Sequence, residues 1–111
     1  MTRPEPHSSL DTPTSDAPGR DTSLVTRPPT SVRLYSKSID SLGSRLTIYQ
    51  VSGGLAAMSA WFEEQRRRGL HEIPPSTFEN RRVYQGPRGR AVVTVRTDPR
   101  TTIVTVVELF K

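Results

Sequence analysis

Residues 81–110 read RRVYQGPRGRAVVTVRTDPRTTIVTVVELF, and this stretch predicts three consecutive β-strands. Valine, isoleucine and threonine dominate residues 90–97 and 101–110, and these β-branched side chains favour extended backbone. Proline and glycine at 86–89 and the Asp-Pro pair at 98–99 are typical of turns between antiparallel strands. The stretch therefore predicts an antiparallel meander of strands at 81–85, 90–97 and 101–110.

The two turns also predict the register of this meander. If Gln85 faces Arg90 and Thr97 faces Thr102, alternate side chains fall on opposite faces of the sheet. One face then collects the residues Tyr84, Ala91, Val93, Val95, Val104 and Val106. The other face is mixed and collects Arg81, Val83, Arg90, Val92, Thr94, Arg96, Ile103, Thr105, Val107 and Leu109. The first set suits contact with a helix, whereas the second has too much hydrocarbon for a fully solvated surface.

A helix is predicted upstream of the meander, at about residues 54–68. One side of this helix carries, at the spacing of 3.6 residues per turn, Leu55, Met58, Trp61, Phe62 and Gln65. Gly69 is the predicted left-handed residue that ends the helix, and Pro74 and Pro75 prevent its continuation. Residues 45–51 (RLTIYQV) are predicted as a strand before the helix, and residues 31–38 as a short edge strand.

These elements predict one small α+β domain over residues 32–111. Its expected architecture is a single helix packed on one face of a small antiparallel sheet, in the order (β)β-α-β-β-β. A domain of this size with one helix covers one sheet face only, and its stability alone is expected to be marginal. The last strand is expected to be an exposed edge that is open to strand addition.

The first 31 residues are predicted to be a disordered tail rich in proline, serine and threonine. Only Leu10, Leu24 and Val25 could bury appreciable apolar surface there, which does not offset the ordering entropy of such a segment. The tail has neither the apolar run of a signal peptide nor a membrane-spanning stretch. Cytoplasm is therefore the default expectation for localisation, without a membrane partner.

The positive charge belongs to the predicted domain. The chain has a formal net charge of +5, and its arginines outnumber its lysines fourteen to two. Excess positive charge can attract nucleic acid, although the codon bias of a GC-rich genome would also favour arginine. In the helix, Glu63 and Glu64 each precede an arginine by four residues, so ion pairs Glu63–Arg67 and Glu64–Arg68 are expected.

One segment is similar to a known RNA-binding family. Residues 47–51 (TIYQV), a helix, and then residues 88–95 (RGRAVVTV) resemble the RNA-recognition motif, in which the residues matching the third-strand pattern are Arg88, Gly89, Ala91 and Val93. The resemblance implies RNA binding on a sheet surface. The aromatic positions that stack bases in that family are occupied here by Arg90, Val92 and Val95, and the family's second helix has no counterpart.

No catalytic, cofactor-binding or metal-binding residues are predicted. The chain has no cysteine, and its histidines are His7, in the tail, and His71, which is expected to form a surface pair with Glu72. The carboxylates are dispersed, so no acid–base pair or set of three or four metal ligands is indicated. We therefore expect neither an enzyme nor a cofactor.

The leading hypothesis is a non-catalytic interaction module that uses the mixed sheet face. Its partner is another protein or a second copy of the chain, and the residues expected to bind it are Arg81, Arg90, Val92, Arg96, Ile103, Val107 and Leu109. The alternative is weak, sequence-tolerant binding of RNA or single-stranded DNA by the same arginines. The sequence leaves these alternatives open.

Overall fold

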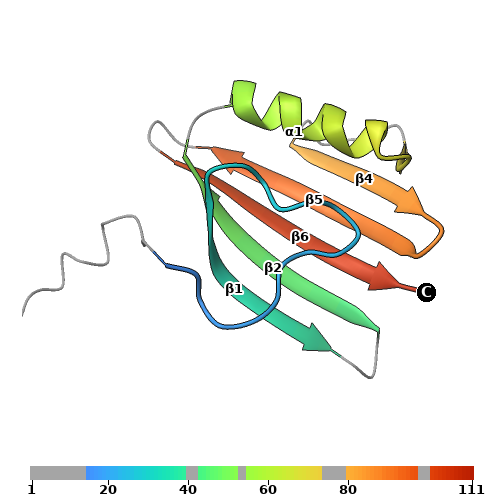
Figure 1. Cartoon of the computed structure of the whole chain (residues 1–111), viewed down its shortest axis with the longest axis horizontal. Coiled ribbons are helices and arrows are strands. Elements are labelled where there is room, and N and C mark those ends of the chain that lie inside the picture. The colour runs from blue at the N-terminus through green and yellow to red at the C-terminus, as the bar shows by residue number, and fades with distance from the viewer. Residues whose placement is uncertain (1–14, 40–42, 53–54, 74–79, 98–100) are drawn as a thin grey trace, which may run out of the picture.

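A computed structural model describes residues 15–39, 43–52, 55–73, 80–97 and 101–111. Figure 1 shows one helix and a six-stranded sheet, which confirms the predicted α+β class. The elements are β1 (Ser31–Ile39), β2 (Ser44–Val51), α1 (Leu55–Arg67), β3 (His71–Glu72), β4 (Arg81–Gly86), β5 (Gly89–Thr97) and β6 (Thr102–Phe110). The two-residue strand β3 was not expected, and β1 has nine residues rather than a short stretch.

The sheet is antiparallel, with the strand order β1-β2-β6-β5-β4-β3. The last strand, β6, lies between β2 and β5, so the expectation that it forms an exposed edge is wrong. β1 and β3 are the edges instead. A register shift between Arg33 and Tyr35 interrupts the pairing of β1 with β2. β5 ends at Thr97 and β6 begins at Thr102, which leaves no room for the second helix of an RNA-recognition motif.

The predicted register of the meander is confirmed. Gln85 pairs with Arg90 across one turn, and Thr97 pairs with Thr102 across the other. All six residues predicted for the helix-side face are buried, and none of them is more than 5% exposed. β2 continues this face with Thr47, Tyr49 and Val51, which are fully buried. We call this buried side of the sheet the inner face and the opposite side the outer face.

Helix α1 contributes the large apolar groups of the core. Its buried residues are Met58, Trp61, Phe62 and Gln65, which belong to the predicted stripe, while the side chain of Leu55 lies outside the described residues. Gly69 adopts φ 94°, and its N–H donates to the carbonyl of Arg66 while the Leu70 N–H donates to that of Gln65. These two bonds form the predicted glycine C-cap, which satisfies carbonyls at the helix end.

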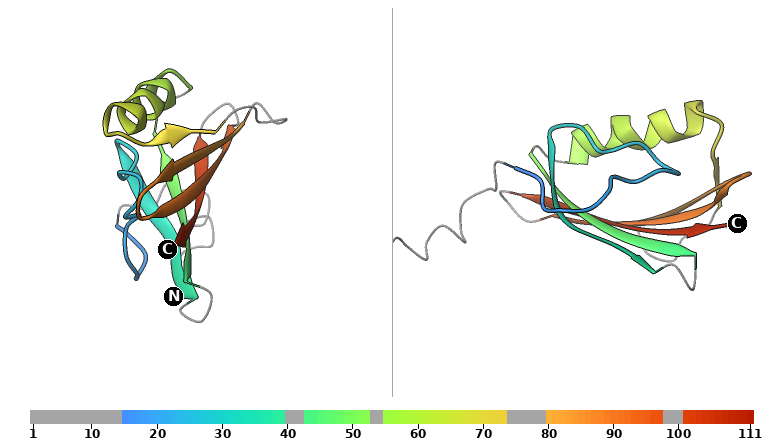
Figure 2. Two further views of the ribbon diagram at one scale, coloured as in Figure 1. Left: turned by 90° about the vertical axis from the view of Figure 1, so that its right-hand side faces the viewer. Right: turned by 60° about the horizontal axis from the view of Figure 1, so that its bottom comes forward.

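Residues 15–30, which we call the strap, lie on the inner face beside α1 (Figure 2). Two of their side chains, Leu24 and Val25, are 6% and 1% exposed and belong to the same core cluster as the sheet valines. This arrangement differs from the disordered tail expected over residues 1–31, because composition does not reveal the long-range contacts of the segment. Residues 1–14 of that expected tail lie outside the described residues. The strap and α1 together cover the inner face.

Candidate functional site

The outer face holds all seven residues that the sequence assigned to partner binding. Arg90, Val92 and Arg96 come from β5, and their cross-strand partners in β6 are Leu109, Val107 and Ile103. Arg81 comes from β4, where it pairs with Thr94. None of these residues is buried, and Leu109 is 44% exposed. Their role as binding residues stays a prediction, but their common face is a property of the structure.

An apolar row crosses the middle of the outer face. Cross-strand pairing places Leu46 beside Val107, Val107 beside Val92, and Val92 beside Val83, so the row spans β2, β6, β5 and β4. All four side chains are partly exposed. We call them the outer row. Sequence reasoning missed Leu46, although the alternation of residues 45–51 would have placed it opposite to Thr47 and Tyr49.

Cationic side chains surround the outer row. Arg90 donates a hydrogen bond of 2.9 Å from Nη2 to Oε1 of Gln85, its cross-strand neighbour. Arg81 and Arg96 lie on the same face toward the other end of the strands, and Lys37 pairs with Leu46 at the β1 side. Among the described strand residues, the register brings no acidic side chain onto this face. The outer face therefore has an apolar centre with a positive periphery.

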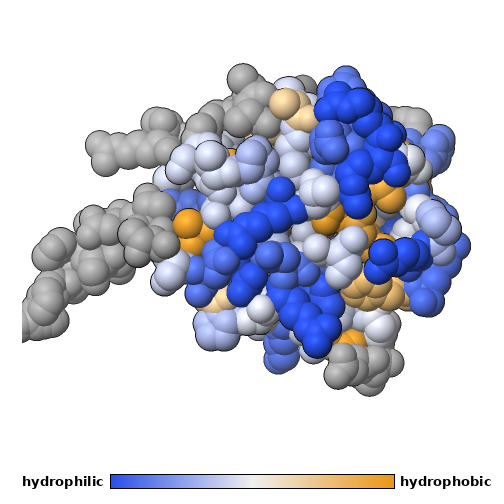
Figure 3. All heavy atoms as spheres, viewed as in Figure 1, coloured by the Kyte–Doolittle hydropathy of each residue, from blue (hydrophilic) through white to orange (hydrophobic). Residues whose placement is uncertain are grey.

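The side covered by the strap and α1 presents a different surface. Hydrophilic side chains dominate it, and hydrophobic residues show only as small separate areas (Figure 3). On α1, Arg66 pairs with Glu63 and Arg67 with Glu64, each at 2.7 Å. These pairs are three residues apart, so the expected pairs Glu63–Arg67 and Glu64–Arg68 are wrong. The helix arginines are thus explained by ordinary surface pairing.

Glu108 anchors the strap from the inner face, near the C-terminal end of β6. This carboxylate is fully buried, and its Oε2 accepts the N–H groups of Ser23 at 2.7 Å and Leu24 at 2.6 Å. Nη1 of Arg45 lies 3.7 Å from the other oxygen and donates to the Asp21 carbonyl and to Oγ of Ser23. Hydrogen bonds to a charged acceptor are stronger than neutral ones, so Glu108 fixes the strap where it crosses β6.

Helix α1 holds the strap at Thr26. Gln65, which is fully buried, accepts the Thr26 N–H at 3.0 Å and donates to Oγ1 of Thr26 at 2.7 Å. Nε1 of Trp61 donates to the Thr26 carbonyl at 3.1 Å. Tyr49 on β2 accepts the Thr22 N–H at 3.1 Å. Side chains of the domain thus satisfy the backbone N–H groups of residues 22, 23, 24 and 26.

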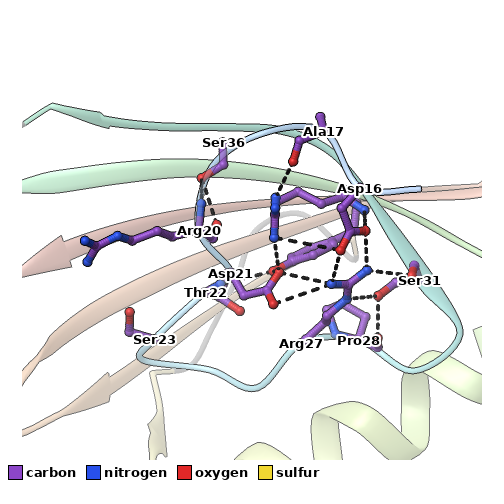
Figure 4. A network of polar contacts seen from close by, with 12 residues as sticks. Asp16, Ala17, Arg20, Asp21, Thr22, Ser23, Arg27, Pro28, Ser31 and Ser36 are labelled. Atoms are coloured by element: carbon purple, nitrogen blue, oxygen red, sulfur yellow. Dashed lines mark hydrogen bonds and ion pairs between the residues drawn. The ribbon is translucent and has the colours of Figure 1, made fainter. Parts of the chain in front are cut away.

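A network of aspartates and arginines closes the other end of the strap (Figure 4). Arg27 contacts Asp16 at 2.6 Å and Asp21 at 3.2 Å, while Arg33 of β1 contacts Asp21 at 2.7 Å. Hydrogen bonds from Arg27 and from the Arg33 N–H hold the pKa of Asp16 well below its usual range. Burial alone would raise the pKa of Asp21, but hydrogen bonds from Arg33 and Tyr49 and the arginine charges lower it.

The strap joins β1 through the residues Pro28, Pro29 and Thr30. Thr30 has φ 46°, in the left-handed region that a β-branched residue rarely adopts. Its hydroxyl donates to the Ser52 carbonyl at 3.1 Å, and its carbonyl accepts the Ser52 N–H at 3.1 Å. Backbone strain of this kind costs ~1 kcal/mol or more, and surrounding contacts must hold it in place. The strained junction marks the point where the strap turns into the sheet.

The described residues contain no arrangement typical of catalysis or metal binding. His71 is exposed in β3 and pairs with Gln85, whereas Glu72 contacts Arg66 and Arg82, so the expected His71–Glu72 pair is not what the structure shows. Within the described ranges, no group of three or more metal-binding side chains comes together. A cavity of about 120 Å³ lies beside Leu24 and Leu70, and a wider hollow of about 450 Å³ lies between the strap and α1 beside Thr26, Arg27 and Trp61.

No helix in the described part of the chain is long and apolar enough to cross a membrane. Comparison of the chain with models of known protein families, with curated proteins and with solved structures found no match.

Proposed function

We propose that the protein is a non-catalytic self-associating module that binds a second copy of itself through the outer face. The observation that supports this proposal is the outer row. Four aliphatic side chains lie side by side across the middle of a sheet whose own helix and strap both cover the other face. Two sheets packed face to face bury such side chains in a core about 10 Å thick.

The layout of the outer face supports a second copy as the occupant. A two-fold axis running along the outer row would place each row residue against its counterpart, as in an isologous interface. The same operation places Arg81 opposite Gln85 of the second copy and Arg90 opposite Thr94 of the second copy, while Lys37, which pairs with Leu46 at the β1 edge, faces its own counterpart there. Neither Arg81 nor Arg90 then faces an arginine of the second copy. The charged side chains remain at the periphery, where interfaces are polar and hydrated.

The experiment is light scattering on the full chain across a range of concentrations. We expect a mass above that of the 12.4 kDa monomer and a lower mass for Val107→Glu than for the unaltered chain at each concentration, because the new carboxylate would be buried without a partner in the outer-face interface. Ala60→Glu is the matched control, since it adds the same charge at an exposed position of α1 on the opposite side of the sheet. An unaltered chain that is monomeric at all concentrations would exclude self-association through this face.

A second candidate is sequence-tolerant binding of RNA or single-stranded DNA by the outer face. Arg81, Arg90 and Arg96 share this face, and the register brings no acidic residue of the described strands beside them. Binding through phosphate contacts would weaken steeply as salt rises. Changing all three arginines to glutamate should abolish binding to a mixed oligonucleotide pool at low salt, whereas failure of the unaltered chain to bind would exclude this candidate.

A further inference from the structure

We propose that the strap exchanges between two copies, so that residues 15–30 of one copy lie in the inner-face groove of another. The groove is the surface of α1, β2 and β6 that contacts the strap through Tyr49, Trp61, Gln65 and Glu108, on the side opposite to the outer row. This exchange does not rest on the outer-face contact, because the two surfaces lie on different faces of the sheet. The segment that we propose to bind there is the strap of the second copy, and the structure shows how a strap binds to this groove.

The groove binds the strap as binding domains hold an extended peptide. Its side chains Tyr49, Glu108 and Gln65 accept four backbone N–H groups of the strap, and Trp61 donates to one of its carbonyls. Leu24 and Val25 fill the apolar part of the groove. Main-chain bonds with pockets for a few side chains are a general mode of peptide recognition. A second copy of the domain would offer every one of these contacts unchanged.

Ion pairs within the strap would be kept when the strap moves to a second copy. Arg27 contacts both Asp16 and Asp21, and all three residues belong to the strap. These aspartates are linked to the sheet by bonds from Arg33 and Tyr49 to their carboxylates and by the bond from Arg45 to the Asp21 carbonyl, and a second copy supplies the same three groups. The strap can therefore move from one domain to another without losing its internal ion pairs.

The junction between strap and sheet favours the exchange. In the closed form seen in the structure Thr30 holds a positive φ, its backbone and hydroxyl bond to Ser52, and Ser31 bonds to Arg27 and Pro28 across the junction. An extended junction would release this strain, and the preceding prolines, Pro28 and Pro29, already favour extended backbone. Short connections under strain are a known cause of segment exchange. The closed and exchanged forms thus share their contacts and differ mainly at this junction.

The test uses engineered cysteines, because the natural chain has none. The Arg20 N–H donates to the Ser36 hydroxyl at 3.2 Å, and this hydroxyl donates to the Arg20 carbonyl at 2.8 Å. The variant Arg20→Cys/Ser36→Cys, made in the Val107→Glu background, is incubated at high and low concentration and then oxidised. We expect disulfide-linked dimers on denaturing gels at high concentration and internally linked monomers at low concentration. Internal links alone at every concentration would overturn the proposal.

The Val107→Glu background separates this result from the outer-face contact. Linked dimers in that background support exchange whether or not the outer face associates, and their absence overturns exchange while leaving the outer-face proposal in place. If the double-cysteine variant fails to fold, a labelled synthetic peptide of residues 15–30 is added to the unaltered full chain instead. Displacement of the chain's own strap by the peptide supports exchange, and no binding at millimolar peptide contradicts it.

Substitutions at the junction test the role of strain. Thr30→Asn should lower the fraction of linked dimer by about fivefold, because asparagine tolerates the left-handed region and so stabilises the closed form. Thr30→Ala is the control, since it also removes the hydroxyl but lacks the preference of asparagine for the left-handed region. Equal fractions of linked dimer in both variants would show that strain at Thr30 does not drive the exchange.

Discussion

The two faces of one sheet differ in what covers them. The inner face has a complete cover, in which α1 contributes Met58 and Trp61 and the strap contributes Leu24 and Val25. The outer face carries the outer row and a positive periphery, with no described element of the chain packed over it. Both faces come from the same strands, so alternate residues of β5 and β6 experience opposite environments.

This difference shows that a short segment can replace a second helix. The strap forms no regular helix or strand, yet it completes the core because buried side chains bond its backbone at Thr22, Ser23, Leu24 and Thr26. Buried backbone groups without partners would cost free energy comparable to a lost hydrogen bond each. The inner face is therefore closed by specific polar anchors as well as by apolar contact.

The sharpest test of the comparison changes two adjacent residues of β6. Val106 is fully buried on the inner face, so Val106→Glu should destabilise the fold by about 4 kcal/mol or more, through burial of an unpaired charge. Val107→Glu should change the stability of the monomer by about 1 kcal/mol or less, because that side chain lies partly exposed on the outer face. Chemical denaturation followed by circular dichroism measures both. Equal losses of stability in the two variants would contradict the assignment of faces.

A second pair of variants tests whether the strap belongs to the core. Leu24→Ala should lower the free energy of unfolding by about 2–5 kcal/mol, the usual range for a buried leucine, since Leu24 is 6% exposed. Leu109→Ala, on the outer face, should change the free energy of unfolding of the monomer by about 0.5 kcal/mol or less, since Leu109 is 44% exposed. Denaturant titration at a concentration where the chain is monomeric provides the measurement. A negligible effect of Leu24→Ala would mean that the strap does not contribute to the core.

Strong acid should loosen the strap by protonating its aspartates. Asp16 and Asp21 have pKa values below the ordinary 3.8 in the folded chain, so their contribution to stability is present above that pH and is lost as the pH falls further. Trp61 is the only tryptophan and bonds to the strap, so its fluorescence reports the change. In Asp16→Asn this acid-dependent step should become smaller. A fluorescence transition of the same size in both proteins would show that Asp16 does not hold the strap.

The sequence allowed the sheet register to be predicted because its determinants are local. Turn residues at 86–89 and 98–99 lie beside the pairs Gln85–Arg90 and Thr97–Thr102, and a period of two then assigns every residue of both strands to a face. The seven outer-face residues were located in this way. The contribution of β2 to that face was missed because its pairing with β6 joins segments far apart in the chain.

The strap could not be predicted from composition, because its partners are distant. Ser23 and Leu24 bond to Glu108, which lies about 85 positions along the chain. One indication was available in the pattern itself. Continuing the inner-face alternation from Val104 and Val106 leads to Glu108, and a carboxylate there requires partners from another segment. The strap supplies these partners. Its large apolar residues are Leu24 and Val25, and its composition is otherwise that of an unstructured chain.

The irregular edges of the sheet limit how copies could aggregate. A bulge interrupts β1 at Arg33 and Tyr35, and β3 at the other edge has only two residues. Fibril growth requires a long, straight edge onto which a further chain can add hydrogen bonds laterally. Within the described residues neither border provides such a template, so we expect the valine-rich strand at the centre of the sheet to be protected from amyloid-like polymerisation.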